Sequence, residues 1–346
     1  MHEVLAELME GGELTEERSA EVFGGVMDGG AEPLQVASLL SLLASRGPTV
    51  GEVVGLARVM RERVRRVAVP SGLTVIDTCG MGGTGSRLFN ISTTTAIVAA
   101  AAGRSRGLCV CKHGNRSVTS VSGSSQAIEL LGVNVEADDA TLTKCLDEVG
   151  LCFCHAPMFH SAMKHAAPIR KALGFRTIFN VVGPLTNPAG AKRQLIGVPT
   201  VAMTELVAEA VRRLGDERSM IVHCRLPDGR PLGELTTFGT NTYRELDHGM
   251  VSGGTLEAES LGLPLGIPSA AEVESPEASA ELIGRLLGGE HGPARDVVLL
   301  NTAAALRVGG AIDDLREGIE LAAEAIDSGA AKETLSRLGA MTKGGG

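Results

Sequence analysis

The spacing of apolar residues changes near residue 70 of the chain. Before this point Leu, Val, Ala and Met recur at helical intervals, which predicts four helices, at residues 3–9, 15–27, 32–45 and 50–66. Their apolar faces exceed what one small bundle can bury. We therefore expect a small helical domain that forms a homodimer through these faces.

After residue 72, short apolar runs that predict strands alternate with helical patterns. This alternation indicates right-handed crossovers and a mainly parallel sheet. The expected fold class is therefore α/β: a small helical domain at 1–68, joined by a helical segment near 160–190, and a large α/β domain at 72–340 with helices flanking its central sheet. The strands are predicted at 73–77, 107–111, 151–154, 194–198, 219–223 and 240–247, and the helices at 96–102, 126–131, 140–149, 156–174, 203–214, 277–287, 296–308 and 313–328, followed by a disordered Gly-rich tail.

Charge and hydropathy limit the possible partners. The 346 residues carry a formal net charge of −9 without a basic stripe, so nucleic acid is not an expected partner. The first residues, MHEVLAELMEGGEL, are acidic where a signal peptide would be basic. No apolar run approaches the roughly 20 residues of a membrane span. We expect a cytoplasmic protein that does not bind membranes.

Seven cysteines are present, and four of them form two C-x-C pairs, Cys109 with Cys111 and Cys152 with Cys154, inside apolar runs. Alternate residues of a strand point to the same face, so the two thiols of each pair would share a face. Neither pair has a His or a further Cys pair at zinc-ligand spacing. The pattern predicts buried free thiols, not a metal clip or a disulfide.

A dense polar segment, KHGNRSVTSVSGSS at residues 112–125, follows the second predicted strand. Ligands of doubly wound sheets bind at the loops that leave the carboxyl ends of the strands. Lys112 and Arg116 supply positive charge, the serines supply hydroxyls, and Gly114 and Gly123 allow close approach of backbone N–H groups. The sequence therefore predicts an anion-binding loop here.

A second anion loop is predicted one strand away. The segment TCGMGGTGS at 78–86 is followed by Asn90 and a Ser/Thr run that opens an Ala-rich helix, as in a phosphate cradle at a helix N-terminus. The spacing is not that of a P-loop. His155, His160 and His165 fit no single helical face, so we expect hydrogen-bonded or solvated histidines there, not a metal site.

Four segments together closely resemble the anthranilate phosphoribosyltransferases, and the similarity covers nearly the whole chain. These segments are the glycine loop with NIST at 90–93, KHGNRS at 112–117, residues 165–170, and RTIFNVVGPLTNP at 176–188. The resemblance implies a dimer of a small helical domain and a large α/β domain. It also implies transfer of a phosphoribosyl group from phosphoribosyl pyrophosphate to anthranilate in tryptophan biosynthesis, with release of pyrophosphate and with Mg²⁺ as cofactor.

The resemblance also implies roles for individual residues. Lys112, His113 and Arg170 would position the substrates, with Arg170 facing the anthranilate carboxylate. Catalysis would then rest on positioning and charge neutralisation. Phosphoribosyl pyrophosphate would contact Gly80, Gly82, Gly83, Asn90, Ser92, Thr93, Lys112 and Ser124; anthranilate would contact Gly80, His113, Asn115 and Arg170; and Mg²⁺ would be held by Ser92 and Glu234.

Four positions depart from the family pattern. Thr84, Gln126 and Gly233 stand where the family has acidic residues, and Val121 stands where it has a basic one. All four would lie on the pyrophosphate and magnesium side, and Mg²⁺ depends on few protein oxygens. Three hypotheses follow: the family reaction with a looser metal site in which Asp228 could substitute; a related glycosyl transfer or phosphorolysis with another donor; or a non-catalytic ligand-binding paralogue.

Overall fold

A computed structural model describes residues 1–82, 84–116 and 121–344 of the chain. Its strands form one sheet in the order β3-β2-β1-β4-β5-β7-β8, with the short β6 paired to β5. The strands are β1 Thr74–Gly80, β2 Leu108–Gly114, β3 Leu151–His155, β4 Arg193–Gly197, β5 Arg218–Arg225, β6 Pro231–Leu232, β7 Thr240–Asp247 and β8 Met250–Leu256.

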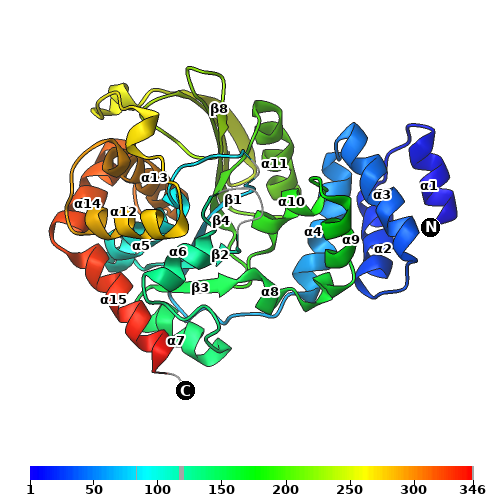
Figure 1. The fold of residues 1–346 in the computed structure, drawn as a ribbon, viewed down its shortest axis with the longest axis horizontal. Coiled ribbons are helices and arrows are strands. Elements are labelled where there is room, and N and C mark those ends of the chain that lie inside the picture. Colours follow the sequence, from blue (N-terminus) through cyan, green and yellow to red (C-terminus); the bar gives the residue numbers. More distant parts are fainter. Residues whose placement is uncertain (83, 117–120, 345–346) are drawn as a thin grey trace.

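The parallel part of the sheet brings the carboxyl ends of its strands to one edge. Strands β1 to β5 pair in parallel, and Gly80 of β1 lies beside Gly197 of β4. On the other side Gly114 of β2 lies beside His155 of β3. The predicted α/β class with a mainly parallel sheet is confirmed (Figure 1), and the loops that follow these strands lie at one edge of the sheet.

The edge strand β8 was not predicted from the sequence. Its residues, MVSGGTL, lack the apolar alternation of a half-buried strand, and most of them are exposed. A two-residue turn at His248 and Gly249, both with positive φ, folds β8 back onto β7 in antiparallel register.

The helices have the following bounds: α1 His2–Met9, α2 Glu16–Met27, α3 Pro33–Arg46, α4 Val50–Arg63, α5 Ile91–Gly103, α6 Ser124–Leu130, α7 Asp139–Glu148, α8 Ala156–Phe159, α9 Ala167–Leu173, α10 Phe179–Val182, α11 Val201–Arg213, α12 Pro276–Leu287, α13 Pro293–Gly309, α14 Leu315–Asp327 and α15 Ala330–Lys343. Helices α5 and α13 pack against each other and on the sheet, and nearly all their side chains are buried. None of the described helices is long and apolar enough to cross a membrane.

Two helical predictions were wrong. The tail was expected to be disordered, but α15 packs on α5, α7 and β3, because Ala331, Leu335 and Leu338 form one buried face. The helix predicted at 156–174 is broken into α8, the 3-10 helix η2 Ser161–Lys164, and α9. The break falls at His160, whose backbone angles are not helical.

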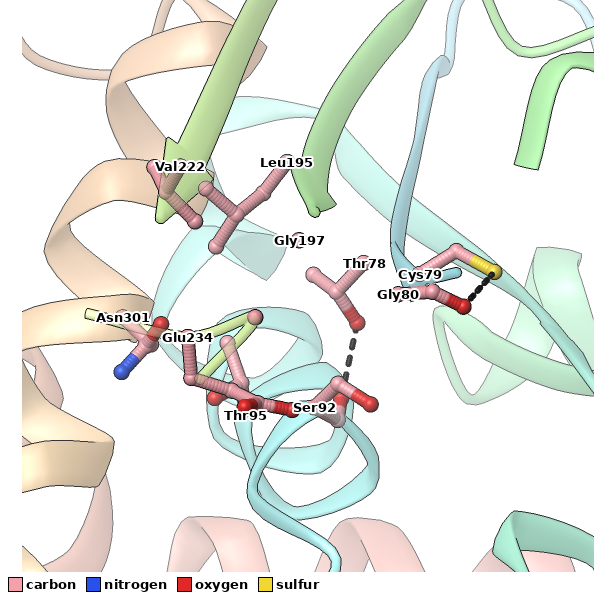
Figure 2. A pocket seen from close by; sticks show the side chains of 11 residues that line it. Thr78, Cys79, Gly80, Ser92, Thr95, Leu195, Gly197, Val222, Glu234 and Asn301 are labelled. Carbon is pink, nitrogen blue, oxygen red and sulfur yellow. Dashed lines mark hydrogen bonds between the residues drawn. The ribbon is translucent and has the colours of Figure 1, made fainter. Parts of the chain in front are cut away.

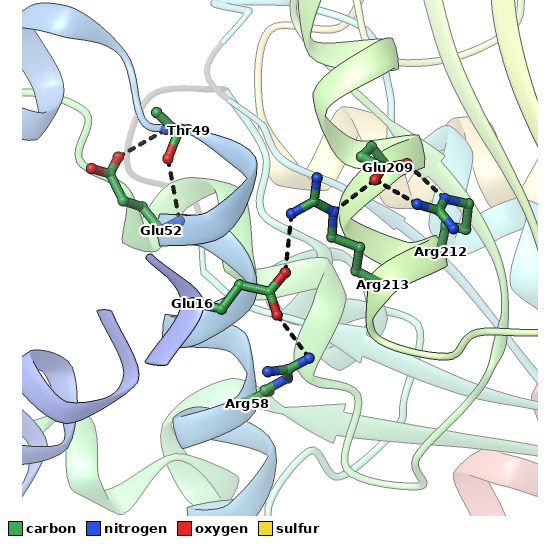
Figure 3. Close-up of polar contacts among 7 residues, drawn as sticks. All are labelled: Glu16, Thr49, Glu52, Arg58, Glu209, Arg212 and Arg213. Atoms are coloured by element: carbon green, nitrogen blue, oxygen red, sulfur yellow. Dashed lines mark hydrogen bonds and ion pairs between the residues drawn. The ribbon is translucent and has the colours of Figure 1, made fainter. Parts of the chain in front are cut away.

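Helices α1 to α4 form a bundle that packs against α9, α10 and α11 (Figure 1). One apolar cluster runs from the bundle into these helices, and within it the rings of Phe23 and Phe179 meet edge to face at 5.8 Å. Polar contacts link the bundle to the end of α11 (Figure 3). Glu16 pairs with Arg58 at 2.8 Å and with Arg213 at 3.1 Å.

The closest packing in the bundle is at Gly55 of α4, which lies against α2. A Cβ at this position would stand 2.4 Å from the Glu16 carbonyl oxygen and 2.6 Å from the Ser19 Cβ. By contrast, Gly25 of α2 is exposed, and a Cβ there would meet no atom within 4 Å. The two glycines therefore allow a controlled comparison, because a methyl group would overlap neighbouring atoms at residue 55 but not at residue 25.

We expect Gly55→Ala to lower the free energy of unfolding by about 1–3 kcal/mol, because the added methyl overpacks the contact between α2 and α4. Gly25→Ala should instead be neutral or raise it by about 0.5–1 kcal/mol, because alanine loses less backbone entropy on folding. Urea unfolding followed by circular dichroism measures both changes. Equal midpoints for the two variants would contradict this packing.

Candidate active site

The site begins where α5 starts beside the end of β1. Asn90 occupies the position before the helix, but its side chain does not cap it. Instead, the Asn90 Oδ1 accepts hydrogen bonds from the hydroxyls of Ser122, at 2.6 Å, and Ser279, at 2.8 Å. The first N–H groups of α5 therefore have no side-chain cap, and the positive end of this 13-residue helix is suited to an anion.

A small pocket opens next to this helix start (Figure 2). The Thr78 hydroxyl at the end of β1 donates to the Ser92 carbonyl at 2.8 Å, which ties the strand to the helix. The predicted residues Gly80, Ser92 and Glu234 thus meet in one place. The lining also includes Cys79, Thr95, Leu195, Gly197, Val222, Gly233 and Asn301.

Lys112 and His113 belong to strand β2, not to the loop in which they were predicted. Both are buried, and Lys112 is only 2% exposed. The strand continues past its apolar run because buried partners receive these polar groups. The Lys112 ammonium donates to the His113 carbonyl at 3.2 Å, and the His113 N–H donates to the Asp77 carboxylate at 3.2 Å.

Asp77 is the centre of a buried polar network. Its second carboxylate oxygen accepts a 2.8 Å hydrogen bond from the side-chain amide of Asn187, which also donates to the Cys111 carbonyl. Burial raises the pKa of Asp77 to about 6, while the charge of Lys112 and the amide of Asn187 oppose this rise. The network joins β1 and β2 to Asn187, which directly follows the 3-10 helix η3 (Gly183–Thr186).

Two buried histidines face each other beside this network. The Nε2 atoms of His113 and His160 lie 3.3 Å apart, and their ring centroids lie 5.1 Å apart. Burial lowers the pKa of His113 to about 3, with the neighbouring His160 and Lys112 adding to this effect. Burial also lowers the pKa of His160 to about 4. The pair is therefore neutral near pH 7, with one ring donating to the other.

Arg170 lies on α9, outside the pocket of Figure 2. Its half-buried guanidinium lies 5.3 Å from the centre of the Phe179 ring, and burial lowers its pKa. Among residues 1–82, 84–116 and 121–344, no carboxylate pairs with it. A partly buried guanidinium without a carboxylate partner is suited to an anionic ligand.

The residues after β2 hold the loop in place. The Ser124 hydroxyl donates to the Asn115 carbonyl and accepts from the Asn115 N–H, at 3.2 and 3.1 Å. Gly114 is required here, since a Cβ would stand 2.4 Å from the Ser124 Oγ. Arg116, predicted to bind an anion, instead pairs with Glu129 at 3.0 Å on the surface.

The structure describes part of the predicted site. Gly83 and the serines at 117 and 120 lie outside the described residues. Gly82 is described and exposed, with a positive φ of 59°. Thr93 is fully buried in α5, and its hydroxyl finds no partner within the described part of the chain.

The four departing residues take structural contacts. The Gln126 side chain accepts a hydrogen bond from the Gly123 N–H at 3.1 Å, at the start of α6. Val121 packs against the main apolar core, and the Thr84 hydroxyl accepts from the Ser86 N–H at 3.3 Å. The backbone of Gly233 lies so close to β4 that a Cβ on Gly197 would stand 1.6 Å from the Gly233 oxygen.

A divalent cation fits the pocket through Ser92 and Glu234. Burial raises the pKa of Glu234 to about 7, and the charge of Lys112 and the backbone of Gly233 only partly oppose it. No described Lys or Arg forms an ion pair with this carboxylate, and no other carboxylate lines the pocket. A carboxylate, a hydroxyl and substrate oxygens are ligands that Mg²⁺ accepts. Asp228, considered as a substitute ligand, is outside the pocket and pairs with Arg230 at 2.7 Å.

Sequence reasoning missed Asn301, which holds the segment that carries Glu234. The Asn301 amide donates to the Leu235 carbonyl at 2.7 Å and accepts from the Leu235 N–H at 3.2 Å. The sequence does contain a hint of this role, because Asn301 is a single asparagine within the apolar helix α13. Asp77 and Asn187 were missed as well, and only the fold brings them together.

Comparison with known proteins agrees with this geometry. Residues 72–332 match a glycosyl transferase family model for an a/b domain, and residues 2–64 match the model for the helical bundle domain of that family. The chain is 46% identical over 341 residues to the anthranilate phosphoribosyltransferase of Parvibaculum lavamentivorans, covering 99% of this chain and 97% of the relative. It is 43% identical over 338 residues to that of Acetivibrio thermocellus, covering 98% and 95%.

Solved structures share the whole fold. The anthranilate phosphoribosyltransferase of Thermus thermophilus superposes with a TM-score of 0.89 at 38% identity, covering 98% of this chain and 99% of that one. The enzyme of Saccharomyces cerevisiae, solved in complex with phosphoribosyl pyrophosphate and Mg, superposes with a TM-score of 0.86 at 26% identity, covering 98% and 96%.

The buried histidine pair predicts a pH effect. The folded pKa values of about 3 and about 4 lie below the roughly 6.5 of an unfolded histidine, so the unfolded chain binds more protons between these values. The stability that the pair contributes is therefore complete above about pH 6.5 and is lost as the pH falls toward 4. In NMR spectra, the ring signals of His113 and His160 should not show the large shift of imidazole protonation between pH 8 and about 5.

The same signals in urea-unfolded protein serve as the control, and there they should titrate near pH 6.5. His113→Gln and His160→Gln variants assign the signals. A full titration of either ring at pH 6 to 7 in the folded protein would show that the pair is not buried as described.

Proposed function

This chain belongs to the anthranilate phosphoribosyltransferase family, and from this premise we propose that it transfers a phosphoribosyl group from phosphoribosyl pyrophosphate to anthranilate in tryptophan biosynthesis. The observation that carries the proposal is the uncapped start of α5, which opens into a pocket with Ser92 and Glu234. An anion-binding helix start beside a metal-suited carboxylate is what a phosphorylated, Mg²⁺-dependent donor requires.

The donor side of the site lies between β1 and α5. We assign the phosphate groups to the N-terminus of α5, with Asn90, Ser92 and Thr93, and the ribose and pyrophosphate to Gly80, Gly82 and Gly83. Lys112 and Ser124 complete this assignment. The buried charge of Lys112 has no carboxylate within ion-pair distance among the described residues, so a phosphorylated ligand would neutralise it.

The acceptor side is assigned to Gly80, His113, Asn115 and Arg170. The neutral ring of His113, held against His160, would line the acceptor side without placing a charge against the aromatic amine. The guanidinium of Arg170 would receive the anthranilate carboxylate, because no described carboxylate already occupies it.

The reaction demands little proton transfer from the protein. As pyrophosphate leaves C1 of the ribose, positive charge builds on the sugar. The aromatic amine attacks from the other side, and its nitrogen releases one proton once the C–N bond has formed. Lys112 and the α5 N-terminus stabilise the negative charge on the phosphates, and Arg170 orients the amine. Bound Mg²⁺, held by Ser92 and Glu234, would add positive charge against the departing pyrophosphate.

We also propose that the chain forms a homodimer through the helical bundle and is divided into two domains. Leu34 of α3 is 83% exposed and Met9 at the end of α1 is 76% exposed, so the outer side of the bundle presents large apolar side chains. The division into residues 1–68 and 72–340 follows the change of pattern in the sequence. No described contact favours phosphorolysis or a non-catalytic role over the family reaction.

The decay of anthranilate fluorescence tests the reaction, with purified protein, phosphoribosyl pyrophosphate and a series of Mg²⁺ concentrations. The chain has no Trp, so its own emission interferes little. We expect decay that saturates with Mg²⁺. A folded protein that binds either substrate but gives no decay at any Mg²⁺ concentration would overturn the proposal.

Glu234→Gln should raise the Mg²⁺ concentration for half-maximal rate by about tenfold or more, because it removes the single carboxylate of the pocket. Glu205→Gln is the control, since Glu205 is an exposed surface residue paired with Arg244. The same fluorescence assay measures both variants. If Glu234→Gln needs the same Mg²⁺ concentration as the unmodified protein, Glu234 does not bind the metal.

Arg170→Ala should raise the KM for anthranilate by about 10- to 150-fold, the loss of a hydrogen-bonded charge pair of about 1.5–3 kcal/mol. The KM for phosphoribosyl pyrophosphate should change little. Lys171→Ala, which removes an exposed charge from the next position of α9, is the matched control and should leave both constants unchanged. A change only in the KM for phosphoribosyl pyrophosphate would show that Arg170 does not bind anthranilate.

A further inference from the structure

Three buried thiols gather beneath the candidate site. The sulfur atoms of Cys111, Cys152 and Cys154 all lie within 4.8 Å of one another, and those of Cys111 and Cys154 are 3.4 Å apart. Each side chain is 0% exposed. All seven cysteines of the chain are free of disulfides.

The register of two parallel strands creates this cluster. Cys111 of β2 is the direct partner of Cys152 of β3, and His113 is the partner of Cys154. Partners in a sheet point to the same face, and residues two apart on one strand also share a face. The C-x-C pattern of β3 therefore presents both its thiols to Cys111. Cys109 shares the face of Cys111 but stays outside the cluster.

The spacing fits an ion at the centre of three sulfurs. With metal–sulfur bonds near 2.3 Å, three ligands in a plane would lie about 4 Å apart. Cys111 and Cys154 lie somewhat closer than this, at 3.4 Å, and all three sulfurs lie within 4.8 Å of one another, so small side-chain movements would complete the site.

The surroundings select the kind of ion. Zn²⁺ prefers four ligands, but no His, Asp or Glu joins these three sulfurs in the described part of the chain. The nearby His113 ring already faces His160. The site is also closed to water, which removes the other common fourth ligand. Soft thiolate ligands select Cu(I) and Zn²⁺, and because the fourth ligand that Zn²⁺ takes is missing here, three sulfurs suit Cu(I) better.

We propose that Cys111, Cys152 and Cys154 form a binding site for one Cu(I) ion per chain, held by three sulfurs. The copper enters as Cu(I) and remains Cu(I), and each thiol that binds as a thiolate releases its proton. Entry requires an opening of β3, the terminal strand of the sheet, and of the helices that cover it. This site is separate from the proposed Mg²⁺ pocket, which none of the three cysteines lines.

Anaerobic titration tests the site, with Cu(I) supplied as its acetonitrile complex to the full-length folded protein in competition with bicinchoninate. We expect uptake of one Cu(I) per chain. Cys111→Ala, Cys152→Ala and Cys154→Ala should each weaken this uptake by about 100-fold, the upper end of losses seen even for outer-shell partners. Cys109→Ala, Cys145→Ala and Cys224→Ala are matched controls, since these thiols are buried outside the cluster, and they should bind as the unmodified protein does.

X-ray absorption on the copper-loaded unmodified protein does not depend on the folding of any variant. It should show three sulfur neighbours and no nitrogen. The proposal is overturned by absence of uptake, by equal uptake in the cluster variants and the controls, by a nitrogen in the coordination shell, or by tighter binding of Zn²⁺ than of Cu(I).

Discussion

The buried carboxylate of Asp77 is the interaction that holds the site together. It receives the His113 N–H of β2 and the Asn187 amide, and Asn187 also binds the Cys111 carbonyl. A wholly buried carboxylate is costly unless such partners surround it, and removing one partner would leave an uncompensated group. Asp77 therefore fixes the neighbouring strands at the point where Lys112 and His113 enter the site.

Around this centre several positive groups form no ion pair with a carboxylate of the described residues. The start of α5 has no side-chain cap, Lys112 is buried without an ion-paired carboxylate among the described residues, and Arg170 rests on an aromatic ring. Only Glu234 brings a carboxylate into the pocket. Such an imbalance is costly in the free protein and is relieved by anionic ligands. The electrostatics thus agree with a phosphorylated donor and a carboxylate-bearing acceptor.

The departures from the family pattern are absorbed by local structure. Gln126 receives the Gly123 N–H at the start of α6, and Gly233 allows close contact with Gly197 of β4. Glu234 meanwhile stays in place through Asn301, which holds the adjacent Leu235 by two backbone hydrogen bonds. The carboxylate of Glu234 therefore has a fixed place in the pocket.

Apolar periodicity and glycine-rich turns are local properties, so the bundle, the parallel sheet and the glycine-rich turn before α5 could be predicted from the sequence alone. The anion binding expected at the two loops stays a prediction. Other features depend on contacts between segments far apart in the chain. Strand β2 extends to Lys112 and His113 because residues distant in the sequence bury these side chains. Strand β8 is exposed and forms because it pairs with β7. Strand register gathered Cys111 with Cys152 and Cys154, and no local pattern reveals how two strands align until the sheet has formed.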